Sequence, residues 1–387
     1  MNILILPRWY PNRQDPMPGL SIQRKAEVLA KSHQVVVISV HADPDCPNKF
    51  ETEYSEEKGV MVIRVYYRDM ESSFPGISMF RRLINFFIAY QKGLRIAGGY
   101  KPDIIHSYVL TRTGIIGYYL SFRYHAPHVI SEFWSRYFPE QNMFKGWLRK
   151  RIARFLIQKA ATVIIVSEKL YQAMQAYRLQ NSHHFIVPNI VDTGIFFPET
   201  VEKSGSQKHF IHVSCFDDKS KNISGFLESV NILWQKRKDF HCTLIGVGPD
   251  LERMKTYAGN LGLTGVCVTF DGLRTGGELA DLYRQADFTV QSSRFETFGN
   301  VIIESLACGT PIVSTDVGVA SEVINVKNGI LIRPGDTWEM TVALDKMLDQ
   351  CNSYDPQEVR KTIEGRFTPE AVGHQLISIY STLIAHD

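Results

Sequence analysis

Two glutamates, Glu296 and Glu304, lie eight positions apart in the segment 294–311, which reads RFETFGNVIIESLACGTP. A strand is predicted before it at 288–293, followed by a turn at Gly299 and Asn300 and a helix over 301–308. Because a helix rises about 1.5 Å per residue, both carboxylates can face one pocket. The N–H groups at the helix start favour an anion. Two hydroxyl-binding carboxylates beside a phosphate-binding helix tip would suit a sugar joined to a nucleoside diphosphate. The spacing alone equally allows two unrelated surface glutamates.

The residues around this pair are more specific than its spacing. ETFGN followed by ESLACGTPIV resembles the motif of the retaining glycosyltransferases of family four, which have the GT-B fold. The resemblance implies that Glu296 holds hydroxyls of the donor sugar and that Glu304 binds the ribose. It also implies that the backbone amides of Phe298, Gly299 and Asn300 contact the sugar and phosphate.

The elements that must position these residues form two α/β series. In the first half, near-continuous apolar runs predict buried strands, with helical patterns between them; the predicted strands are 2–7, 34–40, 60–67, 103–108, 128–132, 162–167 and 185–189, and the helices 20–31, 79–98, 112–124, 143–160 and 168–177. A turn-rich linker follows at 191–208, and then a second series. The fold class is therefore α/β, with two tandem Rossmann-like, doubly wound domains facing a cleft.

The domain boundaries follow from this pattern. Residues 1–190 are predicted to form one domain and 191–366 a second. The resemblance implies that the first is the acceptor-side domain and that the second binds the nucleotide sugar. The resemblance implies that a helix at about 367–387 packs back on the first domain.

Two lysines lie between a predicted strand and helix in HVSCFDDKSKNISGF, where the family binds the donor diphosphate. The resemblance implies that Lys221 makes this contact, and without a metal it would stabilise charge on the leaving group. The arginine that the family carries a few residues earlier is replaced by Cys215 or Phe216. Lys219 is a candidate substitute for it, and the alternative for Lys221 is a solvated loop lysine.

Glycines mark the other predicted phosphate and nucleotide contacts. Gly19 precedes a helix, where the lack of a side chain would let a phosphate approach the backbone; the alternative is an ordinary turn glycine. GVGP, with Gly246 and Gly248, fails as a dinucleotide fingerprint, but the family uses this loop beside the nucleotide. Gly272 and Leu273, in VTFDGL, occupy the family's position for backbone contacts to the base.

Two residues of the first half end predicted strands at the cleft edge. His106, in DIIHSY, is a catalytic candidate, although a strand-end histidine is more often structural. Glu132, in SEFWSRYF, is a substrate-binding candidate. Many relatives have a histidine directly after this glutamate, and here the residue is Phe133.

Charge is distributed unequally along the chain. Residues 1–190 carry a net charge of +11 and the remainder carries −8, so the first half is expected to face something anionic. In the helix 143–160 we expect one apolar stripe to cover the sheet (Phe144, Trp147, Leu148, Ile152 and Phe155). The basic residues would lie off this stripe (Lys145, Arg149, Lys150, Arg151 and Arg154). That basic face either is solvated or touches anionic lipid headgroups.

Other classes of protein are disfavoured. No apolar run is long enough to cross a membrane, and no aromatic-plus-basic motif suggests nucleic acid. The six cysteines include no CxxC pair and predict free thiols in a reducing compartment. Asp43 and Asp45 lie in a polar loop, where we expect no metal.

The resemblance therefore implies a retaining, metal-independent glycosyltransferase without a cofactor. It would use a nucleoside diphosphate sugar, UDP favoured over GDP, and a glycan or lipid-linked acceptor in cell-surface polysaccharide or lipopolysaccharide assembly. The pathway rests on analogy. We expect a cytoplasmic protein, either free or peripheral on the inner face of the cytoplasmic membrane. A GT-B sugar-nucleotide epimerase and a non-catalytic nucleotide- or partner-binding paralogue remain alternatives.

Overall fold

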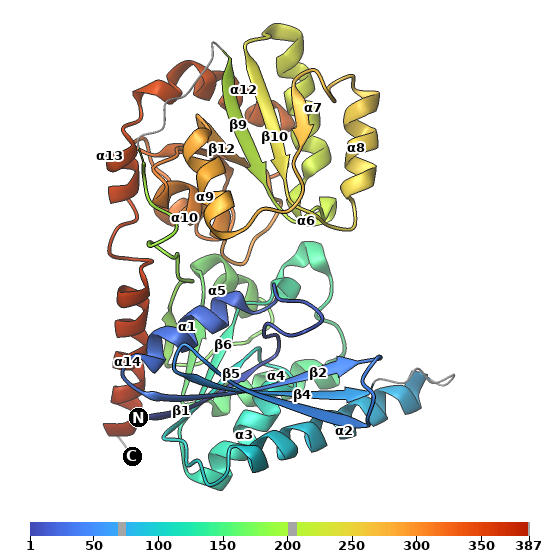
Figure 1. Cartoon of the computed structure of the whole chain (residues 1–387), viewed down its shortest axis with the longest axis vertical. Coiled ribbons are helices and arrows are strands. Elements are labelled where there is room, and N and C mark those ends of the chain that lie inside the picture. Colours follow the sequence, from blue (N-terminus) through green and yellow to red (C-terminus); the bar gives the residue numbers. More distant parts are fainter. Residues whose placement is uncertain (69–74, 200–206, 386–387) are drawn as a thin grey trace. The chain divides into compact units, whose positions relative to one another are not determined.

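The computed structural model describes residues 1–68, 75–199 and 207–385, with only the backbone of 75–80 (Figure 1). The chain forms two compact units. The first unit comprises Met1–Val166, Tyr171–Ile190 and Pro369–Asp387, and the second comprises Ser167–Leu170 and Val191–Thr368. Of the predicted linker, residues 200–206 lie outside the described part of the chain.

The first unit contains an eight-stranded sheet in the order β3-β4-β2-β1-β5-β6-β7-β8. Neighbouring strands are parallel except for the β3–β4 pair. The strands are β1 (Asn2–Pro7), β2 (Gln34–Asp43), β3 (Phe50–Glu57), β4 (Val60–Arg68), β5 (Ile104–Tyr108), β6 (His128–Glu132), β7 (Thr162–Ile165) and β8 (His184–Ile186). Its helices are α1 (Leu20–Ala30), α2 (Pro75–Ile96), α3 (Thr113–Tyr124), α4 (Trp147–Lys159), α5 (Glu168–Gln175), whose first residues belong to the second unit, and α14 (Pro369–Ala385).

Helices cover both faces of this sheet. Since successive side chains of a strand point to opposite faces, each face has its own hydrophobic cluster. On β1, Ile3 and Ile5 pack in the same cluster as residues of α1 and α14. Leu4 and Leu6 pack with residues of α2 and α3. The C-terminal helix thus forms part of the first unit's core, beside α1 (Figure 1).

The strand β3 was not predicted from the sequence. Its segment FETEYSEE is polar, and its burial alternates as expected of an edge strand with one face in water. Lys58 and Gly59 both have positive φ (48° and 82°) and turn the chain into β4. Such a two-residue turn is a recognised hairpin type.

The second unit contains a six-stranded parallel sheet in the order β11-β10-β9-β12-β13-β14. The strands are β9 (Lys208–Val213), β10 (Phe240–Ile245), β11 (Val268–Phe270), β12 (Phe288–Gln291), β13 (Ile312–Thr315) and β14 (Gly329–Ile332). The helices are α6 (Asp218–Lys221), α7 (Ile223–Lys236), α8 (Leu251–Asn260), α9 (Gly276–Gln285), α10 (Asn300–Ala307), α11 (Ala320–Val323), α12 (Thr337–Gln350) and α13 (Pro356–Lys361). The prediction of two Rossmann-like α/β domains is confirmed.

The predicted apolar stripe of α4 is wrong in part. The helix buries Ala153, Leu156 and Ile157, which follow the spacing of one helical face. Trp147, Leu148 and Phe155 are exposed, with 74% of Trp147 accessible. Small and aliphatic residues therefore meet the core, and the large apolar side chains remain at the surface.

Candidate active site

Lys221 and Glu296 form an ion pair in the second unit. Lys221 ends α6, in the connection that follows β9, and Glu296 lies in the loop after the neighbouring strand β12. The carboxyl ends of adjacent parallel strands are where ligands bind in this architecture. Both side chains are mostly buried but reach solvent, with exposed fractions of 17% and 16%.

The carboxylate of Glu296 is fixed through one of its two oxygens. Oε1 accepts hydrogen bonds from Lys221 Nζ, from Ser293 Oγ at 3.0 Å and from Gln291 Nε2 at 3.3 Å. Within the described residues, Oε2 has no hydrogen-bond partner. A carboxylate oriented in this way can accept a hydrogen bond from a ligand hydroxyl through Oε2.

The loop carrying Glu296 is joined to the segment carrying Lys221. Ser292 Oγ donates to the carbonyl of Lys221 at 2.7 Å, and the backbone N–H of Arg294 donates to that of Ser220 at 2.8 Å. His212 Nε2 contacts Ser292 Oγ at 2.9 Å. The relative position of the lysine and the glutamate is therefore fixed by backbone contacts as well as by their own ion pair.

The surroundings of Lys221 keep its ammonium charged. Burial lowers the pKa of Lys221, but its ion pair and hydrogen bond with Glu296, together with the nearby Asp217, outweigh this effect, so the net shift is upward. Cys215 is exposed and lies where the family resemblance predicts an arginine. Lys219 is exposed too, and its role as a substitute stays a prediction.

The start of α10 depends on Gly299, which has φ 92°. A Cβ there would lie 3.0 Å from Ile302 Cδ1 and 3.5 Å from Gln291 Nε2. Phe298 is buried, and its carbonyl accepts from the N–H of Val319 at 2.8 Å. The helix start, beginning at the exposed Asn300, is therefore held by close packing.

Glu304 lies on α10 and is partly buried. Its Oε2 accepts a hydrogen bond from Tyr283 on α9 at 3.4 Å. Burial, and then the charge of Glu304, raise the pKa of that tyrosine well above its usual value. Tyr283 therefore stays a neutral donor that orients Glu304, and ribose binding by Glu304 remains a prediction.

The glycine loops after β10 and β11 meet the loop after β9 at one end of the sheet. A Cβ on Gly246 would lie 1.9 Å from the carbonyl oxygen of Ser214, and one on Gly248 would lie 2.5 Å from the N of Phe216. Gly246 also donates its N–H to the carbonyl of Gly272. These contacts require glycine at 246 and 248 for packing. Gly272 has open space around it, and Leu273 is exposed.

Gly19 occupies a similarly crowded position in the first unit. Its φ is 82°, and a Cβ would lie 2.3 Å from the carbonyl oxygen of Trp9. It precedes α1, whose first turn has no side-chain cap. The position needs glycine for its backbone, and contact with a phosphate there stays a prediction.

The structure gives His106 and Glu132 structural surroundings. His106 is fully buried, with Nδ1 2.6 Å from Tyr380 Oη and Nε2 2.7 Å from Ser131 Oγ. Glu132 is fully buried and accepts from the N–H groups of Leu110, Phe133 and Trp134 and from the hydroxyl of Tyr137. A direct contact with substrate does not fit either position, because every ring nitrogen and carboxylate oxygen is occupied. Burial also lowers the pKa of His106 well below 6.5.

Asp43 likewise has a structural partner. Its carboxylate pairs with Arg13 at 2.6 Å and accepts from Gln14 Nε2 at 2.8 Å. Among the described residues, no three His, Cys, Asp or Glu side chains are grouped so that they could hold a metal ion. In the same part of the chain, no helix combines the length and apolarity needed to span a bilayer.

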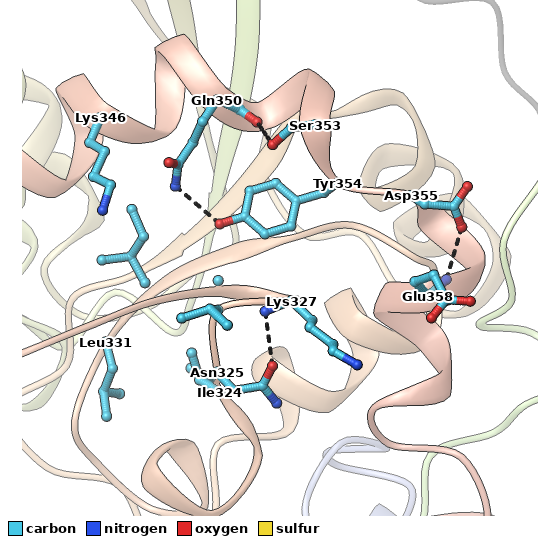
Figure 2. Close-up of a pocket in the computed structure, with 13 residues that line it drawn as sticks. Ile324, Asn325, Lys327, Leu331, Lys346, Gln350, Ser353, Tyr354, Asp355 and Glu358 are labelled. Carbon is cyan, nitrogen blue, oxygen red and sulfur yellow. Dashed lines mark hydrogen bonds between the residues drawn. The ribbon is translucent and has the colours of Figure 1, made fainter.

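A cavity of about 660 Å³ in the second unit has none of the predicted site residues among the residues that line it (Figure 2). It is bounded by the edge strand β14, by α12 and by the segment from Ser353 to Glu358. Tyr354 Oη accepts from Gln350 Nε2 at 3.1 Å, and Asp355 caps α13. The lining includes two lysines, Lys327 and Lys346, and two acidic residues, Asp355 and Glu358. This cavity does not contribute to the Lys221–Glu296 site.

A group of arginines in the first unit was not predicted from the sequence. Arg8, Arg112 and Arg136 follow β1, β5 and β6 and line a shared cavity with Trp134 and Arg149. Two features of the sequence could have indicated this group. An arginine lies within a few residues after each of three predicted strands, and this half of the chain has an excess of positive charge.

Comparisons with known proteins agree with this geometry. A family model described as "Glycosyl transferases group 1" matches residues 207–350, and one described as "Glycosyl transferase 4-like domain" matches 18–190. An uncharacterized glycosyltransferase of Methanocaldococcus jannaschii is 25% identical over 75% of this chain and 76% of its own length. The alpha-monoglucosyldiacylglycerol synthase of Streptococcus pneumoniae is 26% identical over 58% of this chain and 54% of its own.

Solved structures show the same fold over the full chain. Sucrose-phosphate synthase from Thermosynechococcus elongatus has a TM-score of 0.80 at 19% identity, covering all of both chains. Anabaena HepE, solved with UDP and glucose, has a TM-score of 0.75 at 18% identity, covering 99% of this chain and 100% of its own. The two units thus define a GT-B protein. The chain belongs to the group 1 glycosyltransferases, and its activity is glycosyl transfer.

Proposed function

We propose that the chain transfers a sugar from a nucleoside diphosphate sugar, with retention of configuration and without a metal or cofactor. The observation that carries the proposal is the Lys221–Glu296 pair with Glu296 Oε2 left open. Lys221 is assigned to the leaving diphosphate, and Glu296 to the hydroxyls of the donor sugar. HepE, a GT-B protein solved with UDP and glucose, supports UDP as the nucleotide.

In the proposed reaction, the bond between the anomeric carbon and the diphosphate oxygen breaks, and a bond to the acceptor oxygen forms on the same face. The electron pair leaves with the diphosphate, and the proton of the acceptor hydroxyl passes to a donor phosphate oxygen. The charged Lys221 stabilises the negative charge on the departing group. No side-chain nucleophile is needed, which agrees with the buried, occupied state of His106 and Glu132.

The proposed acceptor is a glycan or a lipid-linked sugar in cell-surface polysaccharide or lipopolysaccharide assembly. A relative named for synthesis of a glycolipid supports a lipid acceptor. Trp147, Leu148 and Phe155 are exposed on α4 beside Lys145 and Arg151. An apolar and basic surface of this kind suits peripheral attachment to an anionic membrane. The proposed location is the inner face of the cytoplasmic membrane.

A thermal-shift titration with UDP and GDP in EDTA tests the donor. We expect the melting temperature to rise with UDP, because a ligand that binds only the folded state stabilises it. No shift with either nucleotide at saturating concentration would refute the proposal. Incubation with UDP-sugar alone, followed by product analysis, separates transfer from epimerisation, since an epimerase would convert the donor without an acceptor.

A further inference from the structure

Two cavities of the first unit share Arg8 and Arg112. One, of about 330 Å³, is also lined by Arg136, Arg149 and Trp134, together with aliphatic side chains. The other, of about 360 Å³, also includes Arg82. Within the described residues, neither lining contains an aspartate or a glutamate. The two cavities adjoin at Arg8 and Arg112, and both are basic; together they are called here the arginine pocket.

The strand order explains why these arginines meet. The strands β1, β5 and β6 are consecutive and parallel in the sheet. Arg8 directly follows β1, Arg112 comes four residues after β5, and Arg136 comes four residues after β6. Residues that follow adjacent parallel strands lie at one sheet edge, where ligands bind in α/β folds.

Arg112 is held in an unfavourable backbone conformation. Its φ and ψ are 63° and −71°, and Thr113 N–H donates to the carbonyl of Thr111 at 2.9 Å. This is the rare γ-turn geometry, which is strained for a residue with a side chain. Glycine would adopt it at lower cost. Strain of this kind is typical of functional sites, and here it places a guanidinium where two cavities join.

Four arginines of the arginine pocket lack carboxylate partners among the described residues. In the described parts of the chain, none of Arg8, Arg112, Arg136 and Arg149 forms an ion pair. Arg136 is only 6% exposed, and its Nε has no hydrogen-bond partner in the part of the chain that the structure describes. Burial lowers the pKa of Arg8, and the nearby charge of Arg112 lowers it further. The charge of the buried Glu132 acts on Arg136, but this carboxylate already accepts four hydrogen bonds from other groups.

We propose that the arginine pocket binds a phosphate ester carried by the sugar acceptor. The inference rests on the proposed function, in which Lys221 of the second unit takes the donor diphosphate. Several guanidinium groups without a carboxylate match the charge and the multiple acceptor oxygens of a phosphate. Trp134 and the aliphatic lining offer an apolar surface to the part of the acceptor next to that phosphate. The source is either a soluble sugar phosphate or a lipid phosphodiester.

The test uses the full chain with two arginine variants, Arg112→Gly and Arg8→Gln, and Arg123→Gln on the exposed end of α3 as the matched control. Calorimetry with glycerol 3-phosphate, against glycerol, probes a soluble phosphate ester. Co-sedimentation with phosphatidylglycerol vesicles, against phosphatidylcholine vesicles, probes a lipid source. UDP titration follows the donor site separately.

We expect Arg112→Gly to melt at the same temperature as the wild type or higher, because glycine relieves the strained turn. Its binding of at least one phosphate probe should fall about tenfold or more, with Arg8→Gln behaving alike and Arg123→Gln unchanged. A loss confined to vesicles identifies a lipid source, and a loss confined to glycerol 3-phosphate identifies a soluble one.

Equal binding by the wild type and both arginine variants would overturn the inference, as would no binding of either probe by the wild type. UDP binding should be unaffected by these variants. If UDP binds while the phosphate probes do not respond, the proposed function stands and the arginine pocket fails. If UDP does not bind, the proposed function fails, and the phosphate arm still decides whether the pocket takes a phosphate.

Discussion

Glu296 uses one carboxylate oxygen for Lys221 and keeps the other without a partner among the described residues. The pair is therefore not a closed salt bridge of the kind that only stabilises a fold. A buried ion pair contributes little net stability on its own, because desolvation offsets the attraction. The open oxygen and the charged lysine are better explained as groups held ready for a ligand.

Replacing Lys221 by alanine should weaken UDP binding by about tenfold or more, because hydrogen bonds to charged groups contribute about 1.5–3 kcal/mol. Lys361→Ala is the matched control, since Lys361 is exposed at the end of α13 and is not among the predicted site residues. Calorimetric titration with UDP compares the two. Equal losses would show that Lys221 has no special role in holding the diphosphate.

Glu304→Ala should weaken binding of free UDP more than Glu296→Ala does. Glu304 is assigned to the ribose, which free UDP contains, whereas Glu296 is assigned to the donor sugar, which it lacks. Titration of both variants with UDP measures the difference. With UDP-glucose as ligand, the loss from Glu296→Ala should grow. Similar losses for free UDP in both variants would contradict these assignments.

The fold was predictable where burial is uniform. Strands such as β1 and β2 are apolar throughout because helices cover both faces. The edge strand β3 has one face in water, so its segment carries charged residues and lacks the apolar run from which the other strands were predicted. The ion pair between Lys221 and Glu296 joins residues 75 positions apart. Only the family resemblance indicated that both residues belong to the donor site.

The arginine pocket could not be predicted because it depends on strand order. Arg8, Arg112 and Arg136 follow predicted strands, but a single sequence does not state that β1, β5 and β6 are neighbours. The burial of His106 likewise depends on how elements that are distant in the sequence pack together. Its partner Tyr380 lies on the C-terminal helix, 274 positions away.

Buried neutral histidines should make the protein lose stability as the pH falls below about 6.5. Burial lowers the pKa of His106 well below its usual value, and those of His128 and His212 to about 3. The unfolded chain then binds more protons than the native one, so the free energy of unfolding decreases with falling pH. Each histidine should contribute a loss of about 1.4 kcal/mol per pH unit between about pH 6.5 and its native pKa.

Chemical denaturation at pH 7.5, 6.5 and 5.5 measures this slope. The variant His106→Gln should show a smaller slope than the wild type, because one titrating group is gone, even if its stability at pH 7.5 is lower. A slope that is the same in both proteins would show that His106 does not contribute.

Attachment to anionic membranes should depend on the exposed surface of α4. Trp147, at 74% exposure, would insert at the headgroup level, with Lys145 and Arg151 beside it. Each basic residue near an anionic bilayer contributes about 1 kcal/mol. A variant with Trp147, Lys145 and Arg151 changed to serine should fold normally, because the core face of the helix, Ala153, Leu156 and Ile157, is untouched. Arg154 is left intact, since its Nε donates to the carbonyl of Tyr177 at 3.0 Å.

Co-sedimentation with phosphatidylglycerol vesicles at low salt compares this variant with the wild type. We expect the wild type to pellet and the variant to pellet much less. Binding should fade between 0.1 M and 1 M salt, as the screening length shortens from about 10 Å to about 3 Å. Arg149 is excluded from the substitutions because it also lines the arginine pocket. The α4 surface and the arginine pocket are therefore tested by separate residues. If the wild type and the variant pellet equally, or if neither pellets at low salt, the surface of α4 is only solvated and membrane attachment through it is refuted.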